Sequence, residues 1–431
     1  MSDEDDRSDS WANSQTGLGN GRNARQAYNS FLIRAVKTTP ELDNVYQFSA
    51  LMGRIVAKLP RDSMAAGFTV TELSGDDVTA LEDELTRLDA LSKIADAGIW
   101  SRLYGGAVVY MQLADGLDSA DPIDLTRIRR VQQLIVFERQ EVQVCKWGEY
   151  LGSEYYGRPE QYDIYSMGQT FRVHASRILH FDGIPVSRRM ARQYRGDGFG
   201  QSVVDQVWDA FEQYGTTHSY LADAITRITQ GVVSLKGLTQ SMSTAGGKGL
   251  RSRLQALAAS MSVLGDIAID ADGEKYEVIQ RPVTGFGEAA GVFADRLVAE
   301  TGIPKSILLG ITPGGLNSGG NSGDWQAWST VVGDWRRSQE RNIRRLLQAI
   351  FAQYTSPIET PPRRLTITWP SIMQPTDSEL AAVSLQRAQA RASDVTAGIV
   401  SPMEARASDD VVSTYRTADA AVDTGPGDIG S

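Results

Sequence analysis

The side chains with the clearest chemical potential in this sequence are its three histidines and a serine near two of them. His174 and His180 are six residues apart in a segment that alternates like a β-strand, so we expect both on one face together with Ser176. A histidine pair can begin a metal site, and a serine beside a histidine can be a nucleophile. No Asp, Glu or Cys at ligand spacing completes a metal set, and the G-x-S-x-G turn of serine hydrolases is absent. The pattern therefore favours structural histidines and predicts neither a metal nor a cofactor.

The single cysteine and the acidic residues offer two other kinds of chemistry. Cys145 lies in the strand-like run VQVCKW, where we expect it to be unreactive. The run from Asp3 to Asp6 invites a nuclease interpretation, but four consecutive acids in a flexible tail cannot converge on two metal ions. Catalysis by other carboxylate pairs stays open, since the chain has 53 acidic residues. A metal-dependent nuclease or hydrolase is therefore kept as an alternative.

Two glycine-rich segments could in principle bind phosphate. In the first, Gly196, Gly198 and Gly200 precede Ser202 and an apolar helical face. Its G-x-G-x-G spacing differs from the dinucleotide-binding G-x-G-x-x-G, and the chain lacks the G-K-[ST] of a P-loop. We therefore expect a sharp turn with positive φ before a capped helix.

The second glycine-rich segment, Ile311 to Asp324 (ITPGGLNSGGNSGD), has few side chains to bury and is predicted to be an exposed, mobile loop. A helical pattern that ends at about Glu300 precedes it, and a long amphipathic helix of roughly 40 Å follows from Trp325. A structureless connector and a phosphate cradle are the alternatives, although a cradle would lack a lysine. The middle of the long helix is crowded with arginines, namely Arg336, Arg337, Arg341, Arg344 and Arg345.

The remaining elements point to an α+β fold with a mainly antiparallel sheet. Helical spacing predicts one helix from Glu41 that Pro60 closes, and a second through Leu81, Leu85, Leu88 and Ala95. A capping box at Thr376 to Glu379 predicts a late Ala-rich helix. Period-two alternation predicts strands over Ala107–Leu113, Val131–Phe137, Glu141–Trp147, Gln161–Ser166, Phe171–Phe181 and Arg364–Trp369.

Composition limits the class of protein. The 431 residues are 41% hydrophobic, and no apolar run approaches the ~20 residues that span a bilayer, so no membrane association is expected. The sequence has no signal peptide pattern, and one cysteine suits a reducing cytoplasm. A net charge of -10 argues against tight, nonspecific binding of nucleic acid, which depends on neutralising phosphates with Lys and Arg.

Four of these stretches resemble the portal proteins of tailed bacteriophages and prophages. One resemblance is the run TGIPKSILLG, followed by PGGLNSGGNSGD and then by a long helix that begins with aromatic residues. HASRILHFDG followed by GDGFGQSVVDQVWDAF is similar to its H-x-S-R-[VI]-L … G … G-[WF]-G-x-S junction, and AGIVSPMEAR resembles its late helix. Together they cover most of the chain between about Asn44 and Arg406.

The resemblance implies a portal fold with a wing, two stem helices, a clip, a tunnel loop and a crown. The parts expected in order are a disordered acidic tail (1–29), an α+β wing (30–195), a stem helix (196–230), a small α/β clip (231–283), a second stem helix (284–303), the Gly-rich tunnel loop (304–324), the long helix with a wing strand (325–370), crown helices (371–407) and a disordered tail (408–431). Part of the clip could instead come from the sheet before Gly183.

The function implied is that of a conduit without catalysis. About twelve copies would form a ring at one capsid vertex of the virion, assembled in the host cytoplasm. The expected partners are the large terminase subunit, the major capsid and scaffolding proteins, a head–tail adaptor, and double-stranded DNA passing without sequence specificity. Twelve copies would carry about -120 charges (12 × -10), so negative channel walls would repel the duplex and let it slide. A non-portal minor head protein is the other alternative.

Two sets of residues follow from this interpretation. The tunnel loop that touches DNA would comprise Pro313, Gly314, Gly315, Leu316, Asn317, Ser318, Gly319, Gly320, Asn321, Ser322, Gly323 and Asp324. The five arginines of the long helix, Arg336 to Arg345, would pair with acids of the neighbouring subunit and help to fix the rotation that closes the ring.

Overall fold

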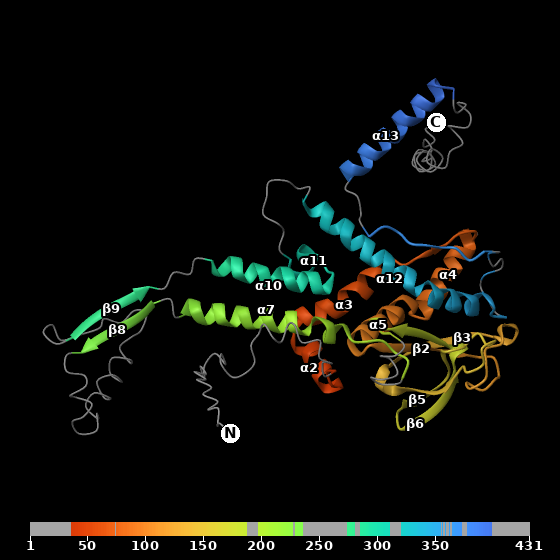
Figure 1. Ribbon diagram of the computed structural model, residues 1–431. Coiled ribbons are helices and arrows are strands. Elements are labelled where there is room, and N and C mark those ends of the chain that lie inside the picture. The colour runs from red at the N-terminus through yellow and green to blue at the C-terminus, as the bar shows by residue number, and fades with distance from the viewer. Residues whose placement is uncertain are drawn as a thin grey trace, which may run out of the picture. The chain divides into compact units, whose positions relative to one another are not determined.

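The computed structural model describes residues 36–73, 75–187, 197–226, 229–235, 274–280, 285–310, 320–354, 356, 358, 362, 364–372 and 377–398 (Figure 1). The expected disordered tails, 1–29 and 408–431, lie outside these residues, as does most of the segment between the strands of the expected clip. The chain divides into two compact units, residues 1–369 and 370–431. The second unit contributes one described helix, α13 (Asp377–Thr396).

Four helices open the first unit: α2 (Thr39–Phe48), α3 (Ala50–Ala65), α4 (Gly75–Arg87) and α5 (Ala90–Tyr104). The predicted single helix through Ala95 is wrong, because Asp89 adopts a left-handed conformation with φ of 49° and separates α4 from α5. Thr38 and Glu41 form a reciprocal capping box at the start of α2, which satisfies two of its free N–H groups.

The prediction that Pro60 ends a helix is also wrong, since Pro60 lies inside α3. A proline has no N–H, so the carbonyl four residues earlier, that of Val56, loses its helical donor. Arg102 of α5 supplies it: its Nε donates to Val56 O at 3.0 Å and its Nη2 to Ile55 O at 2.9 Å. Burial lowers the pKa of Arg102 to about 10. Gly98 allows this close approach, because a Cβ there would lie 2.9 Å from Pro60 Cβ.

Two three-stranded antiparallel sheets follow. The first has the order β3 (Val131–Glu138), β2 (Gly106–Leu113), β7 (Ile178–Asp182), and the second has the order β4 (Val142–Trp147), β5 (Pro159–Ser166), β6 (Gln169–His174). The predicted continuous strand Phe171–Phe181 is wrong, because the 3-10 turn η3 (Ala175–Arg177) divides it and carries the chain from the second sheet to the first. Two other 3-10 turns among the described residues are η1 (Leu125–Arg127) and η2 (Arg139–Glu141).

Two long helices then pack against each other: α7 (Val203–Thr226) and α10 (Phe286–Thr301) run side by side (Figure 1). Between them in the sequence, β8 (Thr229–Leu235) and β9 (Glu274–Gln280) pair antiparallel. Two helices with an inserted segment between them are therefore present, and the part of the expected α/β clip from 236 to 273 lies outside the described residues. The expected stem segment 196–230 is helical from Val203 to Thr226.

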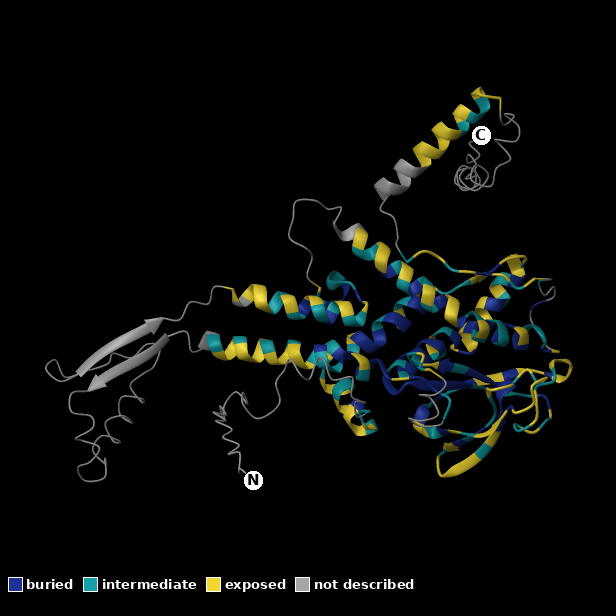
Figure 2. Ribbon diagram, in the orientation of Figure 1, coloured by how far each residue is buried: buried dark blue, intermediate teal, exposed yellow. Residues whose placement is uncertain are grey.

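The last elements of the first unit are α11 (Lys305–Leu309), α12 (Gly320–Phe351) and the short strand β10 (Ile367–Thr368), which pairs with β1 (Thr69–Val70). The C-terminal half of α12 joins α5, β2 and β3 in the main core, where Ile343, Leu346 and Ile350 are fully buried (Figure 2). A second core lies around Val108, Ile164 and Val173 and joins the two sheets. The C-terminal half of α12 thus shares its core with the segment 30–195 that was predicted to be a wing.

Candidate channel and subunit-interface site

The junction before α7 is built from glycines in contact. A Cβ on Gly183 would lie 2.5 Å from Gln201 O and 2.6 Å from Gly105 Cα, and one on Gly200 would lie 2.5 Å from Ile184 O. Gly198 has φ of 79°, and Ser202 accepts a hydrogen bond from Val204 N at 3.0 Å. The predicted sharp turn before a capped helix is therefore confirmed. These glycines approach other backbone segments rather than an open phosphate cradle.

Arg139 connects this junction to the sheets through hydrogen bonds and an ion pair. Its Nε and Nη2 make a bidentate ion pair with Asp197, both at 2.7 Å, and its Nη1 donates to Tyr104 O and Gly200 O at 3.0 and 2.8 Å. The side chain is almost fully buried. One guanidinium thus joins the end of α5, the turn η2 and the segment that enters α7. No local pattern predicts this pair, because the partners are 58 positions apart.

The paired helices α7 and α10 are strongly acidic. Against one arginine, Arg296, and no lysine, they contain seven acids, four in α7 and three in α10. The acids are Asp205, Asp209, Glu212 and Asp223 in α7 and Glu288, Asp295 and Glu300 in α10. Arg296 is itself paired with Glu300 at 2.9 Å, and it also donates to Gln213 across the helix pair. Lys305, from α11, meets Asp295 at 2.8 Å. A duplex beside these helices would meet repulsion from its phosphates rather than contacts that hold it.

The predicted tunnel loop connects two firmly anchored elements. Ser306 Oγ donates to Asp324 Oδ2 at 2.6 Å, which joins α11 to the first turns of α12. Arg54 of α3 donates to Leu308 O at 2.9 Å, and the buried Trp328 donates from Nε1 to Asp62 at 2.9 Å. Both ends of the loop are therefore held on α3.

The extent of that loop needs correction. Gly320, Asn321, Ser322, Gly323 and Asp324 begin α12 rather than end the loop. Pro313, Gly314, Gly315, Leu316, Asn317, Ser318 and Gly319 lie outside the described residues.

Two of the five arginines of α12 contact other parts of the same chain, and pairing of the set with acids of a neighbouring subunit stays a prediction. Arg336 is buried, its Nε donates to Ser63 O at 2.9 Å, and its guanidinium lies 5.0 Å from the ring centre of Trp369. Burial lowers the pKa of Arg336. Arg345 Nη1 donates to Ala175 O and to Ile178 O, both at 2.9 Å, at the turn between the sheets.

The other three arginines differ in exposure. Arg344 donates to Leu365 O and approaches Glu340 at 3.5 Å. Arg337 is exposed, and in the part of the chain that the structure describes it forms an ion pair with the exposed Asp334 at 2.6 Å. Arg341 is exposed, and within the described residues it makes no ion pair or hydrogen bond. Arg337 and Arg341 are four residues apart on one face of α12, so they are the members of the set that remain open to a neighbour.

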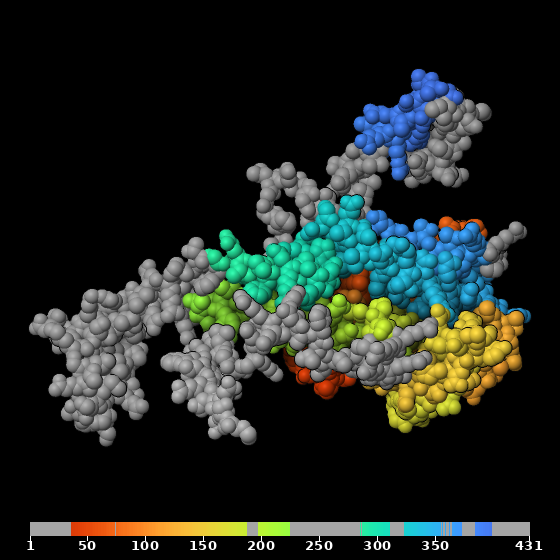
Figure 3. All heavy atoms as spheres, in the orientation of Figure 1, coloured from red at the N-terminus to blue at the C-terminus, as the bar shows by residue number. Residues whose placement is uncertain are grey.

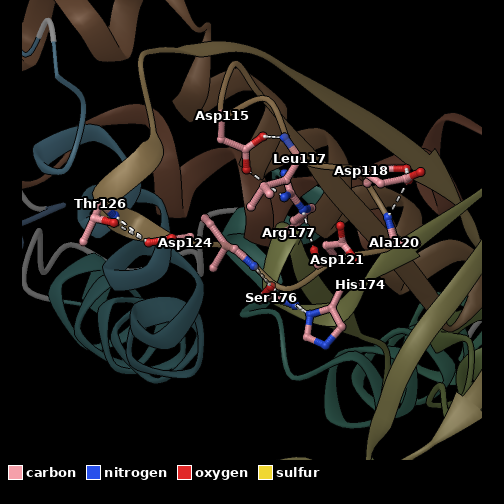
Figure 4. Close-up of polar contacts among 12 residues, drawn as sticks. Asp115, Leu117, Asp118, Ala120, Asp121, Asp124, Thr126, His174, Ser176 and Arg177 are labelled. Atoms are coloured by element: carbon pink, nitrogen blue, oxygen red, sulfur yellow. Dashed lines mark hydrogen bonds and ion pairs between the residues drawn. The ribbon is translucent and has the colours of Figure 1, made fainter.

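The histidine and serine singled out by the sequence are structural. Ser176 Oγ accepts from Ile123 N and meets His174 Nδ1, both at 2.8 Å, while Ser176 N donates to the same Nδ1 at 3.1 Å (Figure 4). Nδ1 is therefore an acceptor, and both side chains are buried. The expected shared face with His180 is wrong, because His180 belongs to the other sheet. There it meets Asp182 and Tyr162 at 2.8 and 3.0 Å.

The buried His174 predicts a loss of stability in mild acid. Burial lowers the pKa of His174 in the folded state, so as the pH falls below about 6.5 the unfolded chain takes up a proton that the folded chain does not. The urea midpoint should fall between about pH 7 and pH 5. His174→Asn, whose side-chain oxygen can still accept from Ser176 N, should reduce this slope. His218→Asn, at an exposed position of α7, is the control, and an unchanged slope in His174→Asn would contradict the assignment.

Other chemistry is limited in the described part of the chain. Cys145 lies on β4 as predicted, and burial raises the pKa of its thiol, with Asp163 contributing in the same direction. Among the described residues, no three His, Cys, Asp or Glu side chains are grouped as a metal site. Nor does any helix among them have the length and apolar character needed to cross a membrane.

Comparison with known families decides where the chain belongs. The family model described as "Phage portal protein" matches residues 40–393, which is most of the chain. The chain is a member of the phage portal protein family. The family match includes both three-stranded sheets, the α7 and α10 pair, and α12, so the resemblance to portal proteins is confirmed over most of the chain. The late stretch AGIVSPMEAR, residues 397–406, lies beyond the matched residues.

Solved structures show the same fold. The neck of a native gene transfer agent particle, computed with C12 symmetry, matches with a TM-score of 0.52 at 16% identity, covering 89% of this portal protein and 97% of that chain. A chain in the virion of a native gene transfer agent particle matches with a TM-score of 0.51 at 15% identity, covering 89% and 96%. At this identity the likeness shows the α+β fold alone.

Two curated relatives carry another description, "Anti-CBASS protein Acb1". The protein from Caulobacter sp. (strain RHG1) is 29% identical over 234 residues, which are 52% of this chain and 37% of the relative. The protein from Sphingomonas paeninsulae is 25% identical over 290 residues, 65% of this chain and 46% of the relative. The chain therefore spans less than half the length of the curated relatives it matches.

Proposed function

We propose that this portal protein forms a closed ring of about twelve subunits through which double-stranded DNA enters and leaves a phage head. The proposal rests mainly on membership of the portal family over residues 40–393. It is supported by the description of a similar neck with C12 symmetry and by the acidic pair of α7 and α10. In a ring, twelve such pairs would line a negative passage, in which a duplex slides because nothing binds its phosphates.

The remaining parts of the proposal concern what the ring binds. The ring would occupy one vertex of the capsid, where the major capsid and scaffolding proteins surround it. The hairpin of β8 and β9 would belong to the clip and meet the large terminase subunit during packaging and the head–tail adaptor afterwards. The segment Pro313–Gly319 would be the part of the tunnel loop that touches the DNA. The ring needs no catalysis of its own for these tasks.

The mass of the purified protein in native buffer tests the ring directly. A closed ring of about twelve chains, imaged with a central hole wide enough for a ~20 Å duplex, is the expected result. A compact dimer that cleaves DNA in the presence of a divalent metal would overturn the proposal in favour of a nuclease. A defined assembly that binds capsid but encloses no hole would favour a minor head protein.

Charge reversal on α12 tests how the ring closes. Arg337→Glu combined with Arg341→Glu should reduce ring formation at least about tenfold, since two exposed arginines would become acids facing a neighbour's carboxylates. The thermal midpoint of the single chain should change little, because both side chains are exposed. Gln348→Glu, exposed near the end of the same helix, is the control. Full ring formation by the double variant would show that these two arginines do not contribute to the interface between subunits.

The anti-CBASS description of the two relatives raises a second function. We infer that the shared part is the portal scaffold, because the matched segments cover only 37% and 46% of those proteins while the portal family match covers residues 40–393 here.

A further inference from the structure

The residues that precede α2 lie against the start of α7. Lys37 N donates to Asp205 Oδ1 at 2.9 Å, and Lys37 Nζ lies 3.9 Å from the ring centre of Trp208. A cation this close to an indole ring forms a favourable cation–π contact. The described part of the chain begins one residue earlier, at Val36. The segment before Val36 is therefore tethered at the surface of α7.

Beyond this contact, one face of α7 is exposed. Trp208, Glu212, Thr216 and Tyr220 follow at four-residue steps and form a stripe, which we call the α7 stripe. Tyr220 is 65% exposed, and the exposed Glu212 has no hydrogen-bond or ion-pair partner within the described chain. None of residues 211–224 is buried, and α7 lies at the surface next to α10 (Figures 2 and 3). The stripe therefore offers one free carboxylate between two aromatic rings.

The sequence before α2 complements this stripe. Between residues 10 and 40 the chain has no Asp or Glu. Its basic residues there are Arg22, Arg25, Arg34 and Lys37. Five apolar residues recur at three- and four-residue steps, the spacing of one helix face, namely Tyr28, Phe31, Leu32, Ala35 and Val36. A basic and apolar segment is thus tethered beside an acidic and aromatic stripe.

The lengths of the segment and of the stripe agree. Arg34 is three residues before Lys37, so about 10 Å of chain at most separates the two. Glu212 is one helical turn, about 6 Å, beyond Trp208, which places it within reach of Arg34. In helical form, residues 25–36 would span about 18 Å, and the rise along α7 from Trp208 to Tyr220 is also about 18 Å. The tether gives the segment a high effective concentration at α7 of its own chain.

We propose that residues 22–36 dock along the α7 stripe of their own chain, with Arg34 paired to Glu212 and the apolar residues covering Trp208 and Tyr220. Aromatic residues and arginine are enriched at the energetic centres of protein interfaces. Duplex DNA fits the segment less well, because a phosphate backbone offers its five apolar residues no partner and the tether holds it at α7. Docking covers α7 alone, so the exposed Glu288 of α10 stays accessible to the proposed passage.

Hydrogen–deuterium exchange of the full chain, at a concentration where it is unassembled, tests the docking. Peptides from residues 212–224 should exchange at least about fivefold faster in Arg34→Glu than in wild type, because the second half of α7 loses its cover. Glu212→Lys should have the same effect, since it brings two cations together. The double variant Arg34→Glu with Glu212→Lys restores an opposite pair and should recover most of the protection. Arg61→Glu, exposed on α3, makes the same change of charge elsewhere and is the control.

Three results would overturn the proposal. One is unchanged exchange of residues 212–224 in both Arg34→Glu and Leu32→Asp. Another is protection that appears only at concentrations where rings form, which would assign the segment to the neighbouring subunit. The third is weaker binding of a 30-base-pair duplex by Arg34→Glu with no change in α7, which would assign the segment to DNA. Failure of the wild-type chain to form rings would count against the proposed function alone, because the exchange is measured on the single chain.

Discussion

Replacement of Arg177 by leucine should lower the free energy of unfolding by about 3–5 kcal/mol, because it leaves the carboxylate of Asp115 buried without its partner. Arg177 Nη2 lies 2.7 Å from Asp115 Oδ2, and the two side chains are 2% and 1% exposed. Arg177 Nε also donates to Asp121 O at 2.8 Å, so the same substitution releases the middle of the connection from β2 to β3. Urea denaturation of the full chain, followed by circular dichroism, measures the change.

Removal of both partners should cost less than removal of one. The double variant Arg177→Leu with Asp115→Leu should recover part of the loss, because no unpaired charge remains. The matched control is Arg172→Leu, whose ion pair with Asp163 at 2.8 Å joins a 54% exposed arginine to a 19% exposed acid. That change should cost no more than about 1 kcal/mol. Equal losses for Arg177→Leu and Arg172→Leu would show that burial does not decide the contribution of these pairs.

The order of elements was predictable because each has a local pattern. The period changes from 3.6 to two after Tyr104, and α7, α10 and α12 each carry an apolar stripe. The glycine junction was predictable because positive φ and a capping serine are properties of single residues, here Gly198 and Ser202. The predictions that failed concerned where helices and strands begin and end. Pro60 did not end α3, since the free carbonyl of Val56 finds a donor 46 residues away, on Arg102.

The candidate site was less predictable, because its important contacts are long-range. Arg336 and Arg345 look like a surface charge run in the sequence, yet their partners are the carbonyls of Ser63 and Ala175, 273 and 170 positions away. The structure therefore separates the arginines of α12 that contact the chain's own backbone from those that are exposed, and their spacing in the sequence does not show this difference. Arg139 and Asp197 carry no local signal at all.

The glycine junction gives the second large effect, through backbone crowding. Gly183→Ala should destabilise the chain by at least about 3 kcal/mol, since the new Cβ would lie 2.5 Å from Gln201 O and 2.6 Å from Gly105 Cα. Both are backbone atoms, so no side chain can rotate to make room. The strain would separate β7 from the segment that enters α7, where Gly183 N donates to Gly105 O at 3.0 Å. The thermal midpoint and ring yield should therefore fall together.

Gly215→Ala provides the matched control for this substitution. Gly215 lies within α7, and a Cβ there would meet nothing within 4 Å. Alanine should stabilise the helix by about 0.5–1 kcal/mol, because glycine loses more backbone entropy on folding. The same chemical change, one methyl group, should thus have opposite signs at the two positions. If Gly183→Ala proved as stable as wild type, the three backbone segments at this junction could not be in close contact. The inference that the sheets are rigidly connected to the acidic helix pair would then be wrong as well.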